Sequence, residues 1–278
     1  MPRFSANLHY LFTEVPFLER FEAAVRAGFE AVEFQVPYDY PASELRARLR
    51  ANGLKMVLFD APVGDWDGGD RGLAAVPGRE REFRESLRRV TEYGKSLDCN
   101  TVHIMAGTVG SGSAYDEAER VYVSNLRLAS DILADHGIVT VIEPINSRMG
   151  AVEGGPDYTT EGMHGYFLNH TKQARRIIDM VGSPNLFLHL DCYHMQMLEG
   201  NLAQTIRDNI EITRHFQIAG VPGRHEPDVG EINYPFLFQL MDELGYPGWV
   251  GCEYRPAGDT VAGLGWAAPY GIGGDSQP

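Results

Sequence analysis

The chain has 278 residues, of which 44% are hydrophobic, and 38 acidic against 24 basic side chains give a formal charge of −14. This length and apolar content fit one large α/β barrel domain or two ordinary domains, and the negative charge disfavours nucleic acid or an anionic membrane surface as a partner. No apolar run approaches the roughly 20 residues of a membrane span, and the N-terminus lacks the apolar region of a signal peptide. The cytoplasm is therefore the expected compartment.

Short apolar or β-branched runs alternate with helical patterns along the chain. The predicted strands are Arg3–Asn7, Ala31–Phe34, Lys55–Phe59, Thr101–Met105, Val139–Glu143, Leu186–Asp191, His215–Ile218 and Trp249–Glu253. The helical patterns between them are VPFLERFEAAVRAG, PASELRARLRANG, REREFRESLRRVTEYGKSL, DEAERVYVSNLRLASDILADHG, TKQARRIIDMVG, LAQTIRDNI and YPFLFQLMDELG. Several of these end in glycine, which is typical of a helix C-terminus.

Eight strand–helix units in about 250 residues have the length and rhythm of a (β/α)8 TIM barrel. An open doubly wound sheet is the structural alternative, although no G-x-G-x-x-G follows the first strand, which weakens its dinucleotide-binding version. We predict a single α/β barrel domain over residues 1–267 and a disordered tail over residues 268–278.

The three cysteines form no recognisable framework. Cys99, Cys192 and Cys252 are far apart and lie outside any CxxC spacing, so neither a disulfide set nor a cysteine zinc site is indicated. We expect buried thiols in a reducing compartment.

Several predicted strands end in an acid or an amide. In GWVGCEYRP, Glu253 closes an apolar run, and Glu143, Asp191 and Gln217 occupy similar places in three other strands. A buried carboxylate without a partner costs several kcal/mol, so each acid must be paired, lie at a strand end or bind a cation. In a TIM barrel the C-terminal ends of the strands meet, so we expect these four side chains to converge.

Three carboxylates and one amide oxygen suit a hard divalent cation. Mg²⁺ or Mn²⁺ fits this set better than Zn²⁺, which prefers His and Cys ligands. The predicted metal ligands are therefore Glu143, Asp191, Gln217 and Glu253. The alternative is that each acid separately caps a helix or pairs with an arginine.

Longer motifs resemble the hydroxypyruvate isomerase family of xylose-isomerase-like TIM barrels, a group that also includes ketose 3-epimerases. The motifs cover nearly all of the chain before residue 267, and the most specific are GDWDGGDRG, VPGRHEPDVGEINY and GWVGCEYRP. The resemblance implies an isomerase that interconverts hydroxypyruvate and tartronate semialdehyde through an enediolate, with a divalent cation. It also implies that Glu143 and Glu253 are the acid/base pair as well as ligands, and that His194 and Arg224 contact the substrate.

This chain departs from the family pattern at two places. Asp60 follows the third strand, where the family tends to have an asparagine that contacts the substrate, and the loop Asn146–His170 is longer than expected. Loops of this length are usually lids, interfaces or mobile segments. A substrate carboxylate needs a cationic partner, for which Arg71 and Arg224 are candidates, unless each pairs with a neighbouring acid.

Strand alternation places three further polar side chains inside the barrel. His189 and His215 should lie one layer below the predicted ligands, where each hydrogen-bonds to a ligand or serves as an ordinary core histidine. Glu33, at the end of the second strand, either reaches the cavity or pairs with an arginine or a backbone amide.

Other functions remain open at this point. A 2-oxo-tetronate isomerase and a ketose 3-epimerase would use the same cation site, and a non-catalytic sugar-binding barrel would use the same fold. A DNA-cleaving zinc enzyme of the same superfamily is disfavoured by the oxygen ligands and the charge of −14. A small hydroxy-oxo acid or sugar is the expected partner, and a homo-oligomer is left open.

Overall fold

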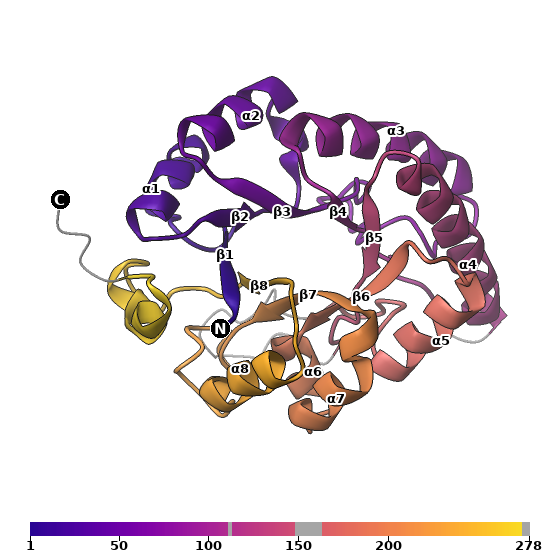
Figure 1. The fold of residues 1–278 in the computed structure, drawn as a ribbon. Helices are drawn as coiled ribbons and strands as arrows, with labels where there is room; N and C mark the ends of the chain where they lie inside the picture. The colour runs from indigo at the N-terminus through magenta and orange to yellow at the C-terminus, as the bar shows by residue number, and fades with distance from the viewer. Residues whose placement is uncertain (111–112, 148–162, 274–278) are drawn as a thin grey trace.

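In the computed structural model, which describes residues 1–110, 113–147 and 163–273, eight parallel strands close into a barrel in chain order (Figure 1). The strands are β1 (Arg3–Asn7), β2 (Ala31–Glu33), β3 (Lys55–Asp60), β4 (Thr101–His103), β5 (Val139–Ile142), β6 (Leu186–Asp191), β7 (Thr213–Ile218) and β8 (Trp249–Cys252). The predicted barrel is confirmed, and each predicted strand agrees with the observed one to within two residues.

Helices surround the barrel and pack their apolar faces on it (Figure 1). They are α1 (Arg20–Arg26), α2 (Ala42–Ala51), α3 (Glu80–Leu97), α4 (Ser113–Ala134), α5 (Thr171–Val181), α6 (Cys192–Leu198), α7 (Leu202–Asn209) and α8 (Tyr234–Glu243), with 3₁₀ helices η1 (Phe17–Glu19), η2 (Pro37–Asp39), η3 (Ile210–Ile212) and η4 (Ala262–Tyr270). In α3, for example, Phe83, Leu87 and Val90 recur at helical spacing and are buried. Within the described ranges, no helix has the length and apolar character needed to cross a membrane.

The structure adds one helix that the sequence analysis did not expect. The residues after Asp191 form α6, which begins at Cys192. Its N-terminus follows directly from β6 because the Asp191 side chain accepts a hydrogen bond from the backbone N–H of Tyr193 at 2.8 Å, which caps the first turn. His194 therefore lies on a helix, and its position is fixed by that helix.

The C-terminal segment is ordered further than we predicted. Residues 268–270 continue η4, whose Tyr270 ring lies edge-to-face 5.1 Å from Phe4 of β1. Ile272 is buried, and Gly273 donates a backbone hydrogen bond to Ala27. Figure 1 shows η4, in yellow, between α1 and α8. Residues 268–273 are therefore part of the folded structure, and residues 274–278 of the predicted tail lie outside the described residues.

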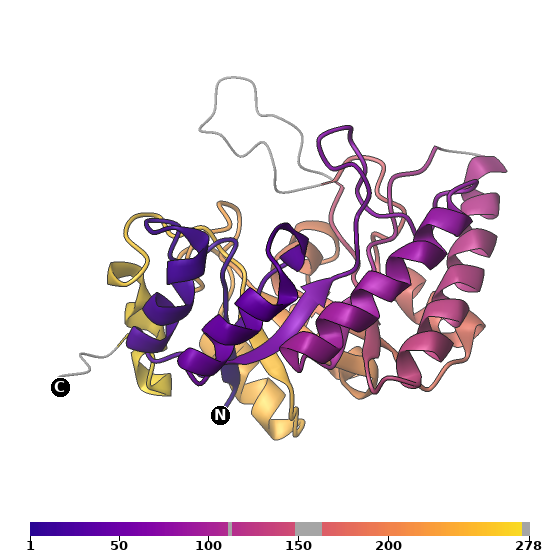
Figure 2. The same cartoon turned by 90° about the horizontal axis from the view of Figure 1, so that it is seen from above.

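Strand register brings the interior side chains into layers. Asp191 of β6 is level with Gln217 of β7, and Gln217 is level with Gly251 of β8. One layer below, the rings of His103, His189 and His215 meet edge-to-face, with centroid distances of 5.3 and 5.2 Å. These histidines form the floor beneath the C-terminal strand ends. Figure 2 shows the loop after β3 rising above the helices.

Candidate active site

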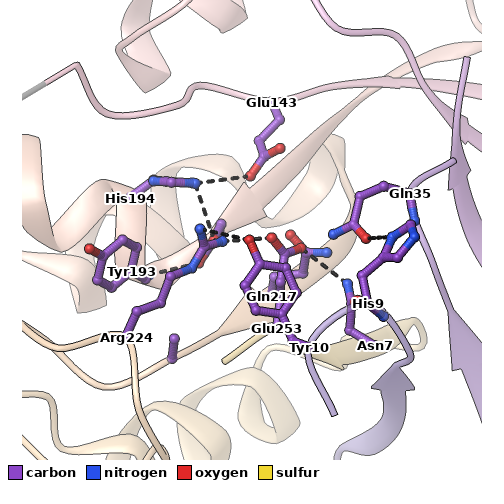
Figure 3. Close-up of polar contacts among 12 residues, drawn as sticks. Asn7, His9, Tyr10, Gln35, Glu143, Tyr193, His194, Gln217, Arg224 and Glu253 are labelled. Carbon is purple, nitrogen blue, oxygen red and sulfur yellow. Dashed lines mark hydrogen bonds and ion pairs between the residues drawn. The ribbon is translucent and has the colours of Figure 1, made fainter. Parts of the chain in front are cut away.

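A cavity of about 910 Å³ opens at the C-terminal ends of the strands. Glu143, Gln217 and Glu253 line it from β5, β7 and β8, together with His194 and Arg224. Figure 3 shows these five side chains converging. The C-terminal ends of several strands contribute to the cavity wall. Residues far apart in sequence therefore meet there, as in other TIM barrels.

Asp191 lies behind this cluster and is not among the residues that line the cavity. It is fully buried, and its Oδ1 accepts the hydrogen bond that caps α6. Its Oδ2 lies 3.3 Å from Arg224 Nη2 and 3.6 Å from His194 Nε2. One oxygen thus caps the helix that follows β6, and the other lies next to Arg224 and His194, two residues that line the cavity.

Glu143 is surrounded by negative charge and by imidazole rings. Burial, followed by the nearby Asp191 and Glu253 carboxylates, raises the pKa of Glu143 well above its ordinary value. Its Oε2 lies 3.7 Å from the Nδ1 atoms of His103 and His189. A carboxyl group whose pKa is raised in this way is suited to take and return a proton.

Glu253 has a comparable environment on the opposite side. Burial raises the pKa of Glu253 well above its ordinary value, and the attraction of Arg224 offsets part of that rise. Glu253 Oε1 accepts a hydrogen bond from Arg224 Nη2 at 2.6 Å, and Oε2 accepts one from Asn7 Nδ2 at 3.3 Å. Two buried carboxyl groups with raised pKa values therefore face one cavity.

Gln217 presents an amide oxygen to which the described part of the chain makes no hydrogen bond of normal geometry. Its Nε2 donates to Glu33 Oε1 at 2.7 Å, whereas Oε1 is buried and unpartnered, although the Gln217 side chain also interacts with the His189 ring. Buried polar atoms are rarely left in this state, so such an atom calls for a ligand. A divalent cation fits this requirement, because carboxylate and amide oxygens are its preferred ligands.

His194 is oriented by a neighbouring amide. Asn146 Nδ2 lies 2.7 Å from His194 Nδ1, and in that orientation Nδ1 accepts and Nε2 carries the ring proton. Burial and then the charge of Arg224 lower the pKa of His194 well below its ordinary value, so the ring is neutral. Although its Nε2 lies close enough to Glu143 and Asp191 to join a metal cluster, a protonated Nε2 donates a hydrogen bond, which suits a substrate contact.

Arg224 is buried inside the cluster. Its guanidinium bridges Asp191 and Glu253 and lies 5.1 and 5.0 Å from the ring centroids of Tyr10 and Tyr193. From the sequence we expected Arg224 to contact the substrate. In the structure it lines the cavity but is also bonded to two predicted metal ligands.

The other two predicted substrate contacts differ in position. Asp60 lines the cavity and lies 3.2 Å from His103 Nδ1. Arg71 is not among the residues that line it. Its Nη1 donates to the carbonyl oxygens of Trp66 and Asp70, and its guanidinium lies 3.9 Å from the Trp66 ring. Arg71 therefore supports the loop that places Trp66 at the cavity mouth. The predicted long loop Asn146–His170 lies partly outside the described residues, at 148–162.

Some site residues escaped the sequence analysis. Asn7 and Tyr10 line the cavity from the end of β1, and His103 lines it from β4. Asn7 closes a strand with a polar side chain, and His103 alternates with apolar neighbours in TVHIM, so the same reasoning that found Asp191 and His189 would have found both.

The chain is similar in sequence and structure to known proteins. The family model described as xylose isomerase-like TIM barrel matches residues 21–270. The chain is 48% identical to 2-oxo-tetronate isomerase of Cupriavidus necator, over 97% of this chain and 99% of the relative. It is 42% identical to hydroxypyruvate isomerase of Escherichia coli, over 97% and 100% of the two chains. The crystal structure named AP endonuclease, family 2, from Brucella melitensis has a TM-score of 0.91 and 46% identity, and the match covers 97% of this chain and 99% of that one.

Proposed function

The chain belongs to the xylose isomerase-like TIM barrel family and is an isomerase, and from this premise we propose that it moves the carbonyl group of a short 2-oxo-3-hydroxy acid between carbon 2 and carbon 3. The observation that supports this best is the convergence of Glu143 and Glu253 on one cavity from β5 and β8. Their raised pKa values suit groups that take and return a proton.

In the proposed reaction one carboxylate removes a proton from carbon 3 of the substrate. The freed electron pair forms the enediolate, and the other carboxyl group returns a proton to carbon 2. The proton on the carbon 3 hydroxyl leaves as the carbon 2 oxygen gains one, so atoms and charge balance. Hydroxypyruvate would give tartronate semialdehyde in this way, with no redox cofactor.

The residues fit a divalent cation, and we assign its ligands to Glu143, Asp191, Gln217 and Glu253. Bound there, Mg²⁺ or Mn²⁺ would supply positive charge that stabilises the negative oxygens of the enediolate. The chain's own groups orient the substrate: Arg224 and the Nε2–H of His194 face the cavity and can hold a carboxylate or an oxygen.

The substrate class follows from this arrangement. Hydroxypyruvate is the smallest acid with the required groups. A 2-oxo-tetronate, which carries one more CH₂OH group on carbon 3, is the second candidate, favoured by the 48% identical relative of that name. DNA cleavage, which the name of the Brucella structure raises, conflicts with the formal charge of −14.

The test is a substrate panel in D₂O with Mn²⁺ present. Hydroxypyruvate and a 2-oxo-tetronate should acquire deuterium on carbon, whereas a neutral ketose should react poorly. Glu253→Gln should slow this exchange about 10²- to 10⁴-fold. The matched control is Glu226→Gln, which alters a buried glutamate bonded to the backbone N–H of Ala257 and should keep normal exchange.

Two results would contradict the proposal. If a neutral ketose were turned over best and inverted at carbon 3, the protein would be an epimerase. If no substrate exchanged and an abasic-site DNA duplex were cut in the same preparation, the assignment to small acids would fail.

A further inference from the structure

Glu33 is a buried carboxylate for which the proposed reaction has no role. It ends β2, is 1% exposed, and accepts from four side chains. The donors are Ser5 Oγ at 2.7 Å, Asn7 Nδ2 at 3.2 Å, His215 Nε2 at 2.8 Å and Gln217 Nε2 at 2.7 Å. Both carboxylate oxygens are therefore engaged by donors from β1 and β7.

The barrel makes room for this carboxylate at Gly251. A Cβ atom on Gly251 would overlap both carboxylate oxygens of Glu33, closer than real Cβ atoms approach. Gly251 is level with Ser5 of β1 and with Gln217 of β7. The glycine in β8 thus leaves space inside the barrel, and the Glu33 side chain fills that space from β2, two strands away.

This arrangement dictates which way the Gln217 amide faces. A carboxylate can only accept hydrogen bonds, so Gln217 must present its NH₂ group to Glu33. Its Oε1 is then directed away from Glu33, and this is the buried oxygen without a hydrogen-bond partner in the described part of the chain. Asn7 Nδ2 also bridges Glu33 Oε1 and Glu253 Oε2, at 3.2 and 3.3 Å. Glu33 therefore orients two amides next to the carboxylate cluster.

We propose that Glu33 is a positioning residue that holds Gln217 with its amide oxygen available to the cation and, through Asn7, fixes Glu253. The inference rests on the proposed function in one respect, the assignment of Gln217 as a metal ligand. Glu33 itself is not assigned as a ligand, because each of its two oxygens already accepts from two donors. The expected effect is of the size seen when outer partners of metal ligands are removed, about 10- to 100-fold in metal affinity.

The experiment measures Mn²⁺ affinity directly, by the electron paramagnetic resonance signal of free Mn²⁺. Glu33→Gln should weaken binding about 10- to 100-fold, because a glutamine at 33 can present NH₂ to Gln217 and no longer selects its orientation. The swap Glu33→Gln with Gln217→Glu should recover affinity, since the amide then donates to a carboxylate ligand. Glu226→Gln is the control, because Glu226 is also a buried glutamate whose Oε1 fills the space next to a glycine, Gly263.

A structure provides a readout that does not depend on a variant. In wild-type crystals with Mn²⁺, anomalous scattering should place the ion at Gln217 Oε1, with Nε2 still on Glu33. An ion bound by Glu33, or one remote from Gln217, would overturn the inference, as would unchanged affinity in Glu33→Gln. Because these readouts need no substrate, a protein that binds Mn²⁺ as described but isomerises no 2-oxo acid would refute the proposed function and leave this inference standing.

Discussion

Replacing Arg224 with methionine should expose the repulsion within the carboxylate cluster. Arg224 Nη2 lies 3.3 Å from Asp191 Oδ2 and 2.6 Å from Glu253 Oε1, and the side chain is 3% exposed. Removing one partner of a buried ion pair costs about 3–5 kcal/mol, because the remaining charge is left uncompensated. At about 2–4 °C per kcal/mol for a chain of this size, Tm of the ion-free protein should fall by roughly 6–20 °C.

The loss should depend on pH, with a sign that follows from Glu253. Burial already raises the pKa of Glu253, and Arg224 lowers it in the wild type, so the variant raises that pKa further. An acid whose pKa is raised by folding contributes its full stability below the pKa of the unfolded chain, about 4.3 for Glu. That stability is lost as pH rises through the folded pKa. The difference in Tm should thus be small near the ordinary pKa and widen as pH rises above it.

The assay is thermal unfolding followed by circular dichroism, in chelator and in Mn²⁺, at three pH values from acid to mildly alkaline. Mn²⁺ should recover more stability in Arg224→Met than in the wild type, because Asp191 and Glu253 no longer share their charge with a guanidinium. A saturating ion at about 100 times its Kd contributes roughly 2.7 kcal/mol. Arg127→Met, which removes bonds to the carbonyl oxygens of Met180 and Val181, is the control. A loss that is the same at every pH, or that Mn²⁺ does not reduce, would refute the reasoning.

Three further outcomes are expected. In chelator, wild-type Tm should fall as pH rises above the ordinary glutamate pKa, because Glu143 and Glu253 have raised pKa values; a flat profile would contradict those shifts. Asp191→Ala should lose most of the Mn²⁺-induced rise in Tm, and an equal rise in both proteins would place the ion elsewhere. Finally, the buried Cys99 thiol, whose pKa burial raises to about 12, should not react with a thiol reagent in the native protein at neutral pH, whereas prompt labelling would show that it is accessible.

The barrel was predictable because hydrophobic residues recur at different spacings in its strands and helices, and because turn residues such as glycine and proline separate these elements. The run TVIEPIN, for example, gives the end of β5 and the place of Glu143 together. Once the barrel is accepted, the meeting of Glu143, Gln217 and Glu253 follows from topology alone. The structure brings all three to one cavity.

What sequence could not supply is the pairing of side chains across the interior. Arg224 bridges Asp191 and Glu253 because of the path that the loop after β7 takes. A loop has no repeating hydrophobic pattern from which that path could be predicted. Arg71 illustrates the same limit: its motif suggests a site residue, but it stacks on Trp66 and is not among the residues that line the cavity. The helix α6 was missed because its seven residues are too few to establish a helical period.

The space at Gly251 has a consequence for how this sequence can change over generations. A Cβ atom at 251 would overlap the Glu33 carboxylate, so a side chain there would displace that carboxylate from its four donors. A larger residue at 251 would be tolerated only after Glu33 had been replaced by a residue with a shorter side chain. That replacement would remove the carboxylate that accepts the hydrogen bond from the Gln217 amide. Substitutions at positions 33 and 251, which are distant in the chain, therefore depend on each other, and the order in which they can occur is restricted.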